Sequence, residues 1–572
     1  MKITCNSPKL LRKVFPYAVV LCILAAAIPY FYSLYGEFVF DDIPLIKNDP
    51  FYVKEANPFK CWNRDFWMES KKQGLYRPVT LFTFWLNARF KDDSGRAISA
   101  IFRTTNLIIH ILVTLLVLKL ALRLKFGHWT AIFAAAIFAV HPIHTEAVIP
   151  AYGRAELLCA LFTLLALILH TYVDRNKLAC VFAGISFLFA CWSKEHGVAV
   201  LPLVFLMDLY LKRPAGLKQA VELVKGRMWI YLSYVAVLGI FFASRYFATG
   251  SLLPSKEFFD PAIDNPIALC HFPLNFISAL KVQGFALSKF FWPAVLSHDY
   301  SYAQLLPSTS VLDWKAWLTV ILFFGIPLLM SFAFRDLRYK LLFLLAAYMV
   351  CILPSGNFIV MTGTIFGERL QYIPSIMLCI FVALIIKELF GRLEFRTVIA
   401  VMFAIIFLLS LRTRARGEDW DTQMSLALAG VRTAPMSIKT WNNLTVELGE
   451  AATLEKDPAL KRKMYEEAVL SCDMALSIYP KYITAYANRG IYNSYLGNYK
   501  QAESDLRMAI SMHANHFMAN YTLGALLANQ GRFEDARVIW ERLLKTNPND
   551  RLLKESYSRL LKDMAKKSGK EN

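Results

Sequence analysis

Charged residues are scarce in this sequence. Only 19% of its 572 residues are Asp, Glu, Lys or Arg, while 56% are hydrophobic, and an ordinary soluble chain contains about 25% charged residues. The scarcity is uneven, because apolar runs of roughly 17–25 residues, long enough to cross a bilayer as helices, recur as far as residue 411. From Glu418 onward the sequence is polar. These features exclude a soluble globular body and predict a membrane domain, residues 1–411, followed by a separate tail.

Paired cysteines and acidic residues are also few. The ten cysteines are scattered and form no CxxC pair, which excludes a disulfide framework or a zinc ribbon as the basis of the fold. The 43 acidic residues leave a net charge of +20. However, Lys and Arg lie at the ends of the apolar runs, where the positive-inside rule places them. We therefore expect contact with membrane lipid and no nucleic-acid partner.

The first apolar run, Val14–Tyr35, has no small-residue cleavage site and is too long for a signal-peptide core, so we expect a retained span. The basic residues before it place the N-terminus in the cytoplasm. Ten more spans are predicted near 98–120, 129–149, 155–173, 178–193, 197–211, 228–247, 313–333, 341–353, 370–386 and 397–411. The run 272–293 is broken by lysines, Gln283 and Pro293, and predicts an interfacial or re-entrant helix.

The loops between these spans separate by charge. One set is basic and is predicted to be cytoplasmic: Arg123, Lys125; Arg175, Lys177; Lys212, Arg213, Lys218, Lys225, Arg227; Arg335, Arg338, Lys340; and Lys387, Arg392, Arg396. The other set is mixed in sign and rich in His and Glu. Eleven spans, an odd number, then place the tail on the non-cytoplasmic side.

The tail contains an internal repeat. Ala468, Ala502 and Ala536 recur every 34 residues, and Gly490 and Gly524 fall where paired helices would pack closely. This period is typical of tetratricopeptide repeats (TPR). We predict a linker at 412–437, TPR repeats with a capping helix at 438–565, and a disordered tail at 566–572.

A TPR stack presents a concave surface to a peptide. Asn443 and Asn488 occupy equivalent positions on the first helices of their repeats, and their amides could hydrogen-bond an extended acceptor backbone. The alternative is that both are ordinary exposed residues.

The first outer loop, residues 36–97, begins with an acidic pair, Asp41 and Asp42. Ionisable residues next to span ends are candidates for function, because charge at bilayer depth is costly. In an extended segment, successive side chains point to opposite faces, so only one of the two is expected to face a reaction centre. A carboxylate there could act as a general base. The alternative is a solvated pair that caps a helix.

Four later outer segments place cations beside carboxylates. They carry His141, His144, Glu146, Arg154 and Glu156; Lys194, Glu195 and His196; His298 and Asp299; and Glu368 and Arg369. We expect one polar cavity, in which Arg154, Lys194 or Arg369 holds a phosphate leaving group. Salt bridges between membrane helices are the structural alternative. The HPIH motif resembles a metal-ligand pair, but its proline-interrupted spacing is weak, and no metal site is expected.

With these residues in view, the chain resembles the transmembrane-and-TPR-repeat-containing protein O-mannosyltransferases of the GT-C glycosyltransferase class. The matching stretches are FVFDD, YRPVTLFTFWLN, HPIHTEAV with GRAELL, SKEHGVAVL, LSHDYS, GERLQYIPS and the TPR tail, in family order. The resemblance implies an all-α, GT-C-like membrane bundle and a TPR solenoid. It also implies a polyprenyl-phosphate sugar donor, with mannose the expected sugar, and transfer to Ser or Thr of a protein. Asp41 or Asp42 would then be the catalytic base.

This reading requires no cofactor, because the lipid-phosphate sugar is itself the co-substrate. Three repeats are fewer than eukaryotic members usually carry, so the resemblance suggests a bacterial relative in the inner membrane, the endoplasmic reticulum membrane being the alternative. Two other functions remain open: sugar transfer to a lipid or surface glycan, and a non-catalytic membrane scaffold or transporter. A scaffold has no reason to cluster Asp41, Asp42, Glu368 and Arg369.

Overall fold

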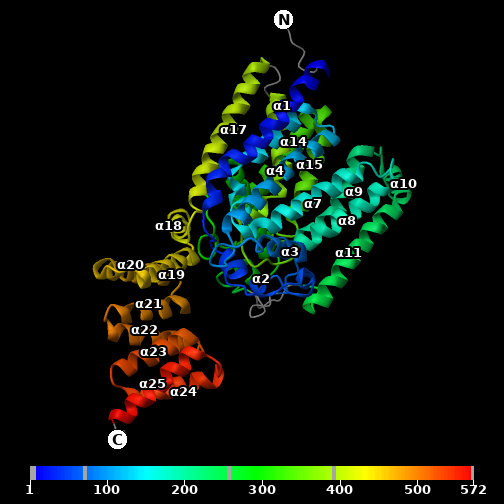
Figure 1. The fold of residues 1–572 in the computed structure, drawn as a ribbon. Helices are drawn as coiled ribbons and strands as arrows, with labels where there is room; N and C mark the ends of the chain where they lie inside the picture. Colours follow the sequence, from blue (N-terminus) through cyan, green and yellow to red (C-terminus); the bar gives the residue numbers. More distant parts are fainter. Residues whose placement is uncertain (1–7, 68–73, 254–258, 390–393, 568–572) are drawn as a thin grey trace. The chain divides into compact units, whose positions relative to one another are not determined.

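The computed structural model describes residues 8–67, 74–253, 259–389 and 394–567 (Figure 1). Within these ranges the chain is helical, and its β-structure is a single isolated bridge between Lys91 and Ala97. The predicted all-α fold class is confirmed. The chain divides into two compact units, the first comprising residues 1–301 and 305–426 and the second comprising 302–304 and 427–572.

The helices of the first unit are α1 (Pro8–Ala27), α2 (Phe51–Lys54), α3 (Pro78–Asn87), α4 (Ser99–Arg123), α5 (His128–Val140), α6 (Thr145–Val148), α7 (Arg154–His170), α8 (Lys177–Ser193), α9 (Val200–Lys212), α10 (Leu217–Gly226), α11 (Met228–Thr249), α12 (Leu274–Phe291), α13 (Trp314–Val320), α14 (Ile326–Ala333), α15 (Arg338–Ile352), α16 (Pro374–Leu389), α17 (Phe395–Glu418) and the start of α18 (Gln423–Thr433). Short 3-10 or π turns join them, among them η1 (Ile28–Tyr35), η2 (Ile43–Lys47), η5 (Pro142–His144), η6 (Ala151–Gly153), η7 (Glu195–Ala199), η9 (Ile321–Gly325) and η11 (Glu368–Gln371).

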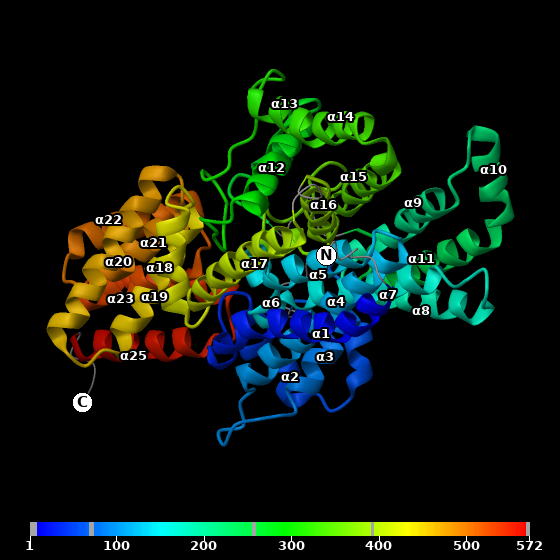
Figure 2. The same cartoon turned by 90° about the horizontal axis from the view of Figure 1, so that it is seen from above.

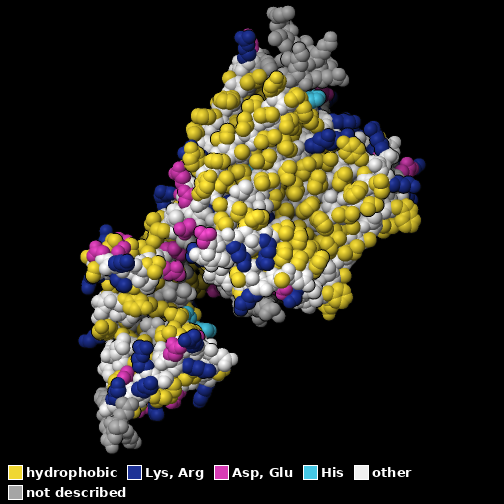
Figure 3. All heavy atoms as spheres, viewed as in Figure 1, with side chains coloured by type: hydrophobic (Ala, Val, Ile, Leu, Met, Phe, Trp, Pro, Cys, Tyr) yellow, Lys and Arg dark blue, Asp and Glu magenta, His cyan; other side chains and the backbone are white. Residues whose placement is uncertain are grey.

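Six described helices are long and apolar enough to cross a membrane: Phe15–Tyr35, Ser99–Arg123, Ala151–His170, Met228–Thr249, Trp314–Ala333 and Arg396–Glu418. A seventh span results if α5 and the segment Pro142–Val148, bent by 52°, count together. Apolar side chains cover much of the outer surface of this unit (Figure 3). The chain is therefore a multi-pass membrane protein.

Each of the eleven predicted spans coincides with a helix, but several of these helices are short. α8, α9, α15 and α16 have only 13–17 residues, below the roughly 20 residues that a full crossing requires. The count of eleven therefore stays a prediction. The run 272–293 forms α12, whose reading as interfacial or re-entrant also stays a prediction. Figure 2 shows α12 and α13 side by side at the edge of the bundle.

Small residues and satisfied polar groups hold the centre of the bundle together. α5 packs against α4 and α16 through buried Ala131, Ala134 and Ala135, since small side chains let membrane helices approach closely. His110 of α4 is fully buried, and its ring nitrogens bond Tyr372 Oη at 2.7 Å and the Ala139 carbonyl at 3.0 Å. Buried polar groups need such partners because water is absent.

The second unit is a helical-hairpin stack. It contains the end of α18 and then α19 (Ile438–Leu454), α20 (Pro458–Ile478), α21 (Ile483–Tyr495), α22 (Tyr499–Met512), α23 (Phe517–Asn529), α24 (Phe533–Thr546) and α25 (Arg551–Lys567). A Cβ at Gly490 would lie 2.7 Å from Leu506 Cγ, and one at Gly524 would overlap the Trp540 indole. Only glycine allows these helix pairs to close, which explains the 34-residue recurrence.

The boundaries of the tail differ in detail from the predicted ranges. α17 continues past residue 411 to Glu418, and α18 lies within the range expected to be a linker. The segment expected to be disordered begins inside α25 at residue 566, and residues 568–572 lie outside the described residues.

Candidate functional site

A sharp turn after the first span presents the acidic pair. Phe40 adopts a left-handed backbone, φ 53°, and the Asp42 N–H donates to the Val39 carbonyl at 3.0 Å. The Phe40 N–H donates to Gln423 Oε1 at 2.5 Å. A positive φ is uncommon for a bulky residue, so the surrounding contacts must hold this turn in place.

The two acidic side chains have different surroundings. Asp42 is fully buried, and its two carboxylate oxygens accept N–H bonds from Ala151 at 3.0 Å and Tyr152 at 2.7 Å. Burial raises the pKa of Asp42 to about 6, against the opposing effect of these bonds and of Arg103. Asp42 therefore braces the loop against η6. Asp41 is only half-buried, so part of its side chain is exposed.

A buried arginine fixes the ends of this loop. Arg103 of α4 donates to the carbonyls of Ser33 at 2.7 Å and Trp420 at 2.8 Å, and also to the carbonyl of Glu37. A Cβ at Gly36 would overlap the Arg103 guanidinium. Arg103 therefore joins the loop, α4 and the segment just after α17.

Glu146 and Arg369 form the ion pair next to this loop. Glu146 is fully buried and pairs with the Arg369 guanidinium, and its Oε2 accepts the Arg369 backbone N–H at 2.9 Å. The guanidinium carbon lies 5.0 Å from the Tyr152 ring centre. Burial opposes the charge of Arg369, but Glu146, Tyr152 and Asp41 together raise its pKa. Asp41 thus lies within electrostatic range of a cation that remains 23% exposed.

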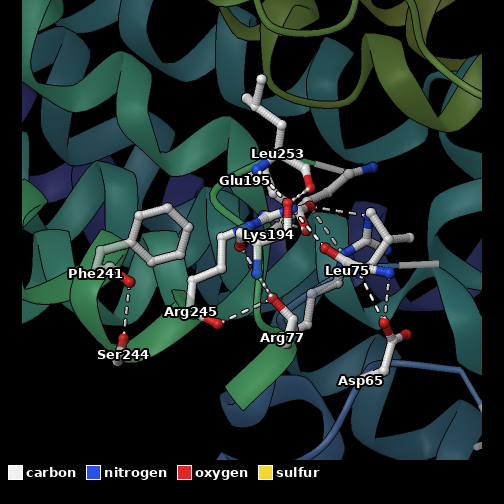
Figure 4. A network of polar contacts seen from close by, with 12 residues as sticks. Asp65, Leu75, Arg77, Lys194, Glu195, Phe241, Ser244, Arg245 and Leu253 are labelled. Carbon is white, nitrogen blue, oxygen red and sulfur yellow. Dashed lines mark hydrogen bonds and ion pairs between the residues drawn. The ribbon is translucent and has the colours of Figure 1, made fainter. Parts of the chain in front are cut away.

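Lys194 and Glu195 belong to a second polar network, drawn in Figure 4. Lys194 pairs with buried Glu156, and His196 Nδ1 lies 3.7 Å from the same carboxylate. Glu195 lies 3.0 Å from Arg77 and 3.6 Å from Arg245. Burial opposes ionisation of Glu195, but Arg77 and Arg245 lower its pKa to about 2.

The two networks lie next to each other. Burial lowers the pKa of Lys194, Glu156 opposes that effect, and the charges of Arg77 and Arg369 lower it further. Lys194 and Arg369 therefore lie within electrostatic range of each other. That either of them binds a phosphate stays a prediction.

Glu368, the residue before Arg369, is fully buried. Its Oε1 accepts hydrogen bonds from the Ser297 N–H at 2.7 Å and from Tyr300 Oη at 2.5 Å, whereas Oε2 has no partner. Burial raises the pKa of Glu368 to about 7; Arg416 opposes this rise and Glu146 adds to it.

The His298 ring lies 5.2 Å from the Phe40 ring, so it adjoins the acidic turn. Burial lowers the pKa of His298 to about 4, although Asp299 opposes the effect. Asp299 Oδ1 accepts the Ser301 N–H at 2.8 Å.

Sequence reasoning missed Arg416 and Trp420. Arg416 is fully buried and pairs with Asp419 at 2.8 Å, and its guanidinium lies 5.6 Å from the Trp420 ring centre. Its Nε and Nη2 have no hydrogen-bond partner. One sequence signal could have identified it. Arg412, Arg414 and Arg416 follow the last apolar run at the end predicted to be non-cytoplasmic, against the positive-inside rule.

Three residues that were predicted to line the polar cavity are held by other protein groups. The Arg154 guanidinium is fully buried and donates to Asn106 Oδ1 at 2.8 Å, Asn87 Oδ1 at 2.5 Å and the Phe102 carbonyl at 2.7 Å. Because protein groups occupy all three guanidinium nitrogens, we withdraw Arg154 as a phosphate ligand.

The two histidines of HPIH also form hydrogen bonds with other parts of the protein. His141 bonds the Phe290 carbonyl at 3.0 Å and the Ile143 N–H at 3.2 Å. His144 bonds the Phe138 carbonyl at 2.9 Å and Ser375 Oγ at 2.8 Å. Both ring nitrogens of each are in use, so these side chains support the fold.

The predicted acceptor residues lie in the second unit. Asn443 on α19 and Asn488 on α21 are both half-buried. Asn488 Nδ2 lies 3.4 Å from Asn442 Oδ1, which joins the two first helices along one face. Their role in binding an acceptor stays a prediction.

An apolar cavity of about 650 Å³ lies in the first unit between α12, α13, η9, α14, α15 and α16. Apolar side chains form most of its wall, and Lys281 and Lys315 contribute the charged groups. Phe285, which lines the cavity, contacts Tyr300 at 5.3 Å between ring centres. Tyr300 in turn donates a hydrogen bond to Glu368.

Comparison with known proteins gives matches to both units. The tetratricopeptide repeat family model matches residues 495–560. The chain is 30% identical over 435 residues to Protein O-mannosyl-transferase F38B6.6 of Caenorhabditis elegans, covering 74% of this chain and 59% of the relative. It is 26% identical over 581 residues to Protein O-mannosyl-transferase TMTC3 of Homo sapiens, covering 94% and 61%. The chain thus spans about three fifths of the length of these relatives.

Solved structures give weaker similarity. One is the oligosaccharyltransferase of Archaeoglobus fulgidus in complex with Zn and sulfate, 15% identical, covering 82% of this chain and 57% of that chain with a TM-score of 0.41. Similarity at this level supports no conclusion about function.

Proposed function

We propose, from the confirmed resemblance of this chain to the transmembrane-and-TPR-repeat-containing protein O-mannosyltransferases, that it is a membrane glycosyltransferase. It moves a sugar, with mannose expected, from a polyprenyl phosphate to a Ser or Thr hydroxyl of a polypeptide. One observation carries the proposal: half-buried Asp41 lies within electrostatic range of Arg369, in a buried polar group that also includes Lys194 and Glu368. A membrane scaffold would not need this clustering of costly buried charge.

Asp41 acts as the general base in this mechanism. Its carboxylate takes the proton of the acceptor hydroxyl as the hydroxyl oxygen forms a bond to the anomeric carbon. The bond from that carbon to the phosphate oxygen breaks, and the configuration inverts. Asp42 contributes indirectly, by holding the turn against η6 through its two backbone bonds.

Arg369 and Lys194 meet the charge that develops on the leaving phosphate. Fixed cations in a site with little water stabilise such charge strongly, since they need no reorganisation during the reaction. Glu146 and Glu156 hold these two cations in place. Neither a metal nor a nucleotide is required, because the lipid phosphate is already a good leaving group.

The apolar cavity is the proposed binding place of the polyprenyl chain. Its volume of about 650 Å³ and apolar walls suit several isoprene units. Phe285 connects it to Tyr300 and Glu368, so a chain bound there would bring its phosphate toward the polar group.

The second unit is the proposed acceptor-binding module. Its TPR stack offers Asn443 and Asn488 on adjoining first helices to an extended peptide. Both the active site and the repeats would lie on the non-cytoplasmic side, with the N-terminus in the cytoplasm. Transfer to a lipid or surface glycan would use the same donor site but not the repeats.

Reconstitution with a panel of polyprenyl-phosphate sugars, with transfer to peptide read by mass spectrometry, tests the proposal. Asp41→Asn should lower kcat by about 10²–10⁴-fold, the range for loss of a general base, and leave the melting temperature unchanged. Asp93→Asn, at an exposed acid of the same outer loop, is the matched control and should keep full activity.

The assay has two informative failures. Full transfer by Asp41→Asn would show that the base is assigned wrongly. Absence of transfer from every donor by the unaltered chain, with the fold intact, would favour the scaffold function.

A further inference from the structure

The connection between α9 and α11 contains a separate amphipathic helix, α10. Its ten residues place Leu217, Ala220, Val221 and Val224 on one stripe, at spacings typical of a single helical face. The opposite face carries Lys218, Gln219, Glu222 and Lys225. Figure 2 shows α10 projecting from the ends of α9 and α11 at the edge of the bundle.

The apolar stripe of α10 is not covered within its own unit. None of its ten residues is buried, and Leu217 is 82% exposed. An isolated helix of fewer than about 12–15 residues is marginal in water even with favourable residues. The stripe therefore needs a partner that covers it.

The start of α11 indicates where α10 lies relative to the membrane. α11 begins at Met228, two residues after α10 ends, and its span runs from Met228 to Thr249. Trp229 is 83% exposed, and Leu232 and Val235 continue its outward apolar face. Because that face must meet hydrocarbon, and exposed Trp favours the membrane interface, α10 lies at the interface.

A buried ion network fixes the end of α10 to the bundle. Arg227 donates to Asp208 Oδ1 at 2.7 Å and pairs with Asp174, and His170 Nε2 lies 3.1 Å from the same Asp208 oxygen. α10 is therefore held at a defined place against α7 and α9, although its own stripe faces outward.

The charge around α10 favours an anionic partner. The helix carries Lys218 and Lys225 against one acidic residue, Glu222, and Arg213 precedes it. Figure 3 shows Lys and Arg side chains gathered over the part of the surface where α10 lies. A short basic amphipathic helix of this kind binds anionic lipid at the headgroup boundary.

We infer that α10 lies along the membrane surface as an anchor for anionic lipid. Leu217, Ala220, Val221 and Val224 enter the acyl boundary, while Lys218 and Lys225 contact lipid phosphates. In the proposed orientation this is the cytoplasmic leaflet. The inference does not depend on the glycosyltransferase activity.

Hydrogen exchange of the full chain in nanodiscs tests the anchor. The probe lipids are phosphatidylcholine alone and phosphatidylcholine mixed with phosphatidylglycerol. Amides of residues 217–226 should exchange about tenfold more slowly in the anionic discs, since each surface lysine contributes measurably to binding. The double substitution Lys218→Gln and Lys225→Gln should remove this difference.

Two controls accompany the measurement. Lys500→Gln with Lys554→Gln makes the same charge change at exposed lysines of the repeats, and should leave the difference intact. Leu217→Asp with Val221→Asp should abolish protection of α10 in both lipids. Unchanged exchange of α7 amides in every variant verifies that the bundle is folded.

Two outcomes would overturn the inference. Equal protection of α10 in both lipids, in the unaltered chain and in the lysine variant, would exclude headgroup recognition. Protection that rises with protein concentration and not with phosphatidylglycerol would show that a second copy of the chain covers the stripe.

Discussion

At the residue scale, neighbouring side chains of the same type have different chemistry because their surroundings differ. Asp41 and Asp42 share a turn, yet two backbone N–H groups occupy the Asp42 carboxylate, while Asp41 remains half-buried near Arg369. Arg154 and Arg369 differ in the same way. Protein oxygen atoms accept hydrogen bonds from all three guanidinium nitrogens of Arg154. Arg369 pairs with the carboxylate of Glu146 and stays partly exposed.

The stability of the protein should depend on the ionisation of Glu368. Burial raises its pKa from 4.5 to about 7, so the folded state holds the proton more tightly than the unfolded state does. Its stabilising contribution is complete below pH 4.5 and is lost as the pH rises through about 7. Between pH 5 and 8 the unaltered chain should therefore lose on the order of 2–3 kcal/mol relative to Glu368→Gln.

Thermal unfolding in detergent across this pH range measures the difference. Glu418→Gln, at an exposed glutamate of the same unit, is the control and should follow the unaltered chain. Parallel pH profiles for the unaltered chain and Glu368→Gln would contradict the assignment of a raised pKa to Glu368.

At the element scale, the site depends on segments that are far apart in the sequence. Arg103 of α4 donates to the end of η1, to the acidic loop and to Trp420 beyond α17. The Glu37 N–H also donates to the Asp421 carbonyl at 2.8 Å. The last span thus helps to hold the first outer loop in position.

Gly36→Ala should disturb this arrangement. The new Cβ would overlap the Arg103 guanidinium, and overpacking of a tight site typically costs about 1–3 kcal/mol. We expect a lower melting temperature and a loss of transfer activity, both measurable on the purified chain.

Gly239→Ala is the matched control. It lies in α11 with no atom within 4 Å of the added Cβ, and alanine favours helix over glycine. Equal melting temperatures for the two alanine variants would show that the Gly36–Arg103 contact is unimportant.

At the scale of the whole molecule, the side of the membrane on which the repeats lie depends on span parity. Eleven spans place the second unit on the non-cytoplasmic side if α12 does not cross. A crossing by α12 would reverse this, because it would make the number of spans even.

Reporter fusions after residue 567 test whether the number of membrane spans is odd or even. Alkaline phosphatase, which requires an oxidising compartment to form its disulfides, should be active there in a bacterial host. A green fluorescent reporter that matures only in the cytoplasm should stay dark. The opposite pattern would place the repeats in the cytoplasm and make the number of spans even, as a crossing by α12 would. Fusions after Leu124 provide the cytoplasmic reference.

The sequence by itself determined the parts of this protein that depend on local pattern. Apolar runs identified the membrane helices, and a 34-residue recurrence identified the repeat stack, because helix length and close helix packing leave a periodic record in the chain. The polar segments beside the apolar runs were also found, since charge next to a span is rare enough to stand out.

Only the tertiary structure decided which of these polar residues act together. Alternation along an extended segment predicted that only one of Asp41 and Asp42 faces a reaction centre. The chain turns at these residues instead, and the N–H groups of Ala151 and Tyr152 hold Asp42. Arg154 was predicted as a phosphate ligand, but α3 and α4 supply acceptors for its guanidinium. Arg416, in a segment predicted to be a linker, lies within electrostatic range of Glu368. Burial and hydrogen-bond partners come from segments distant in the chain, and no local pattern encodes them.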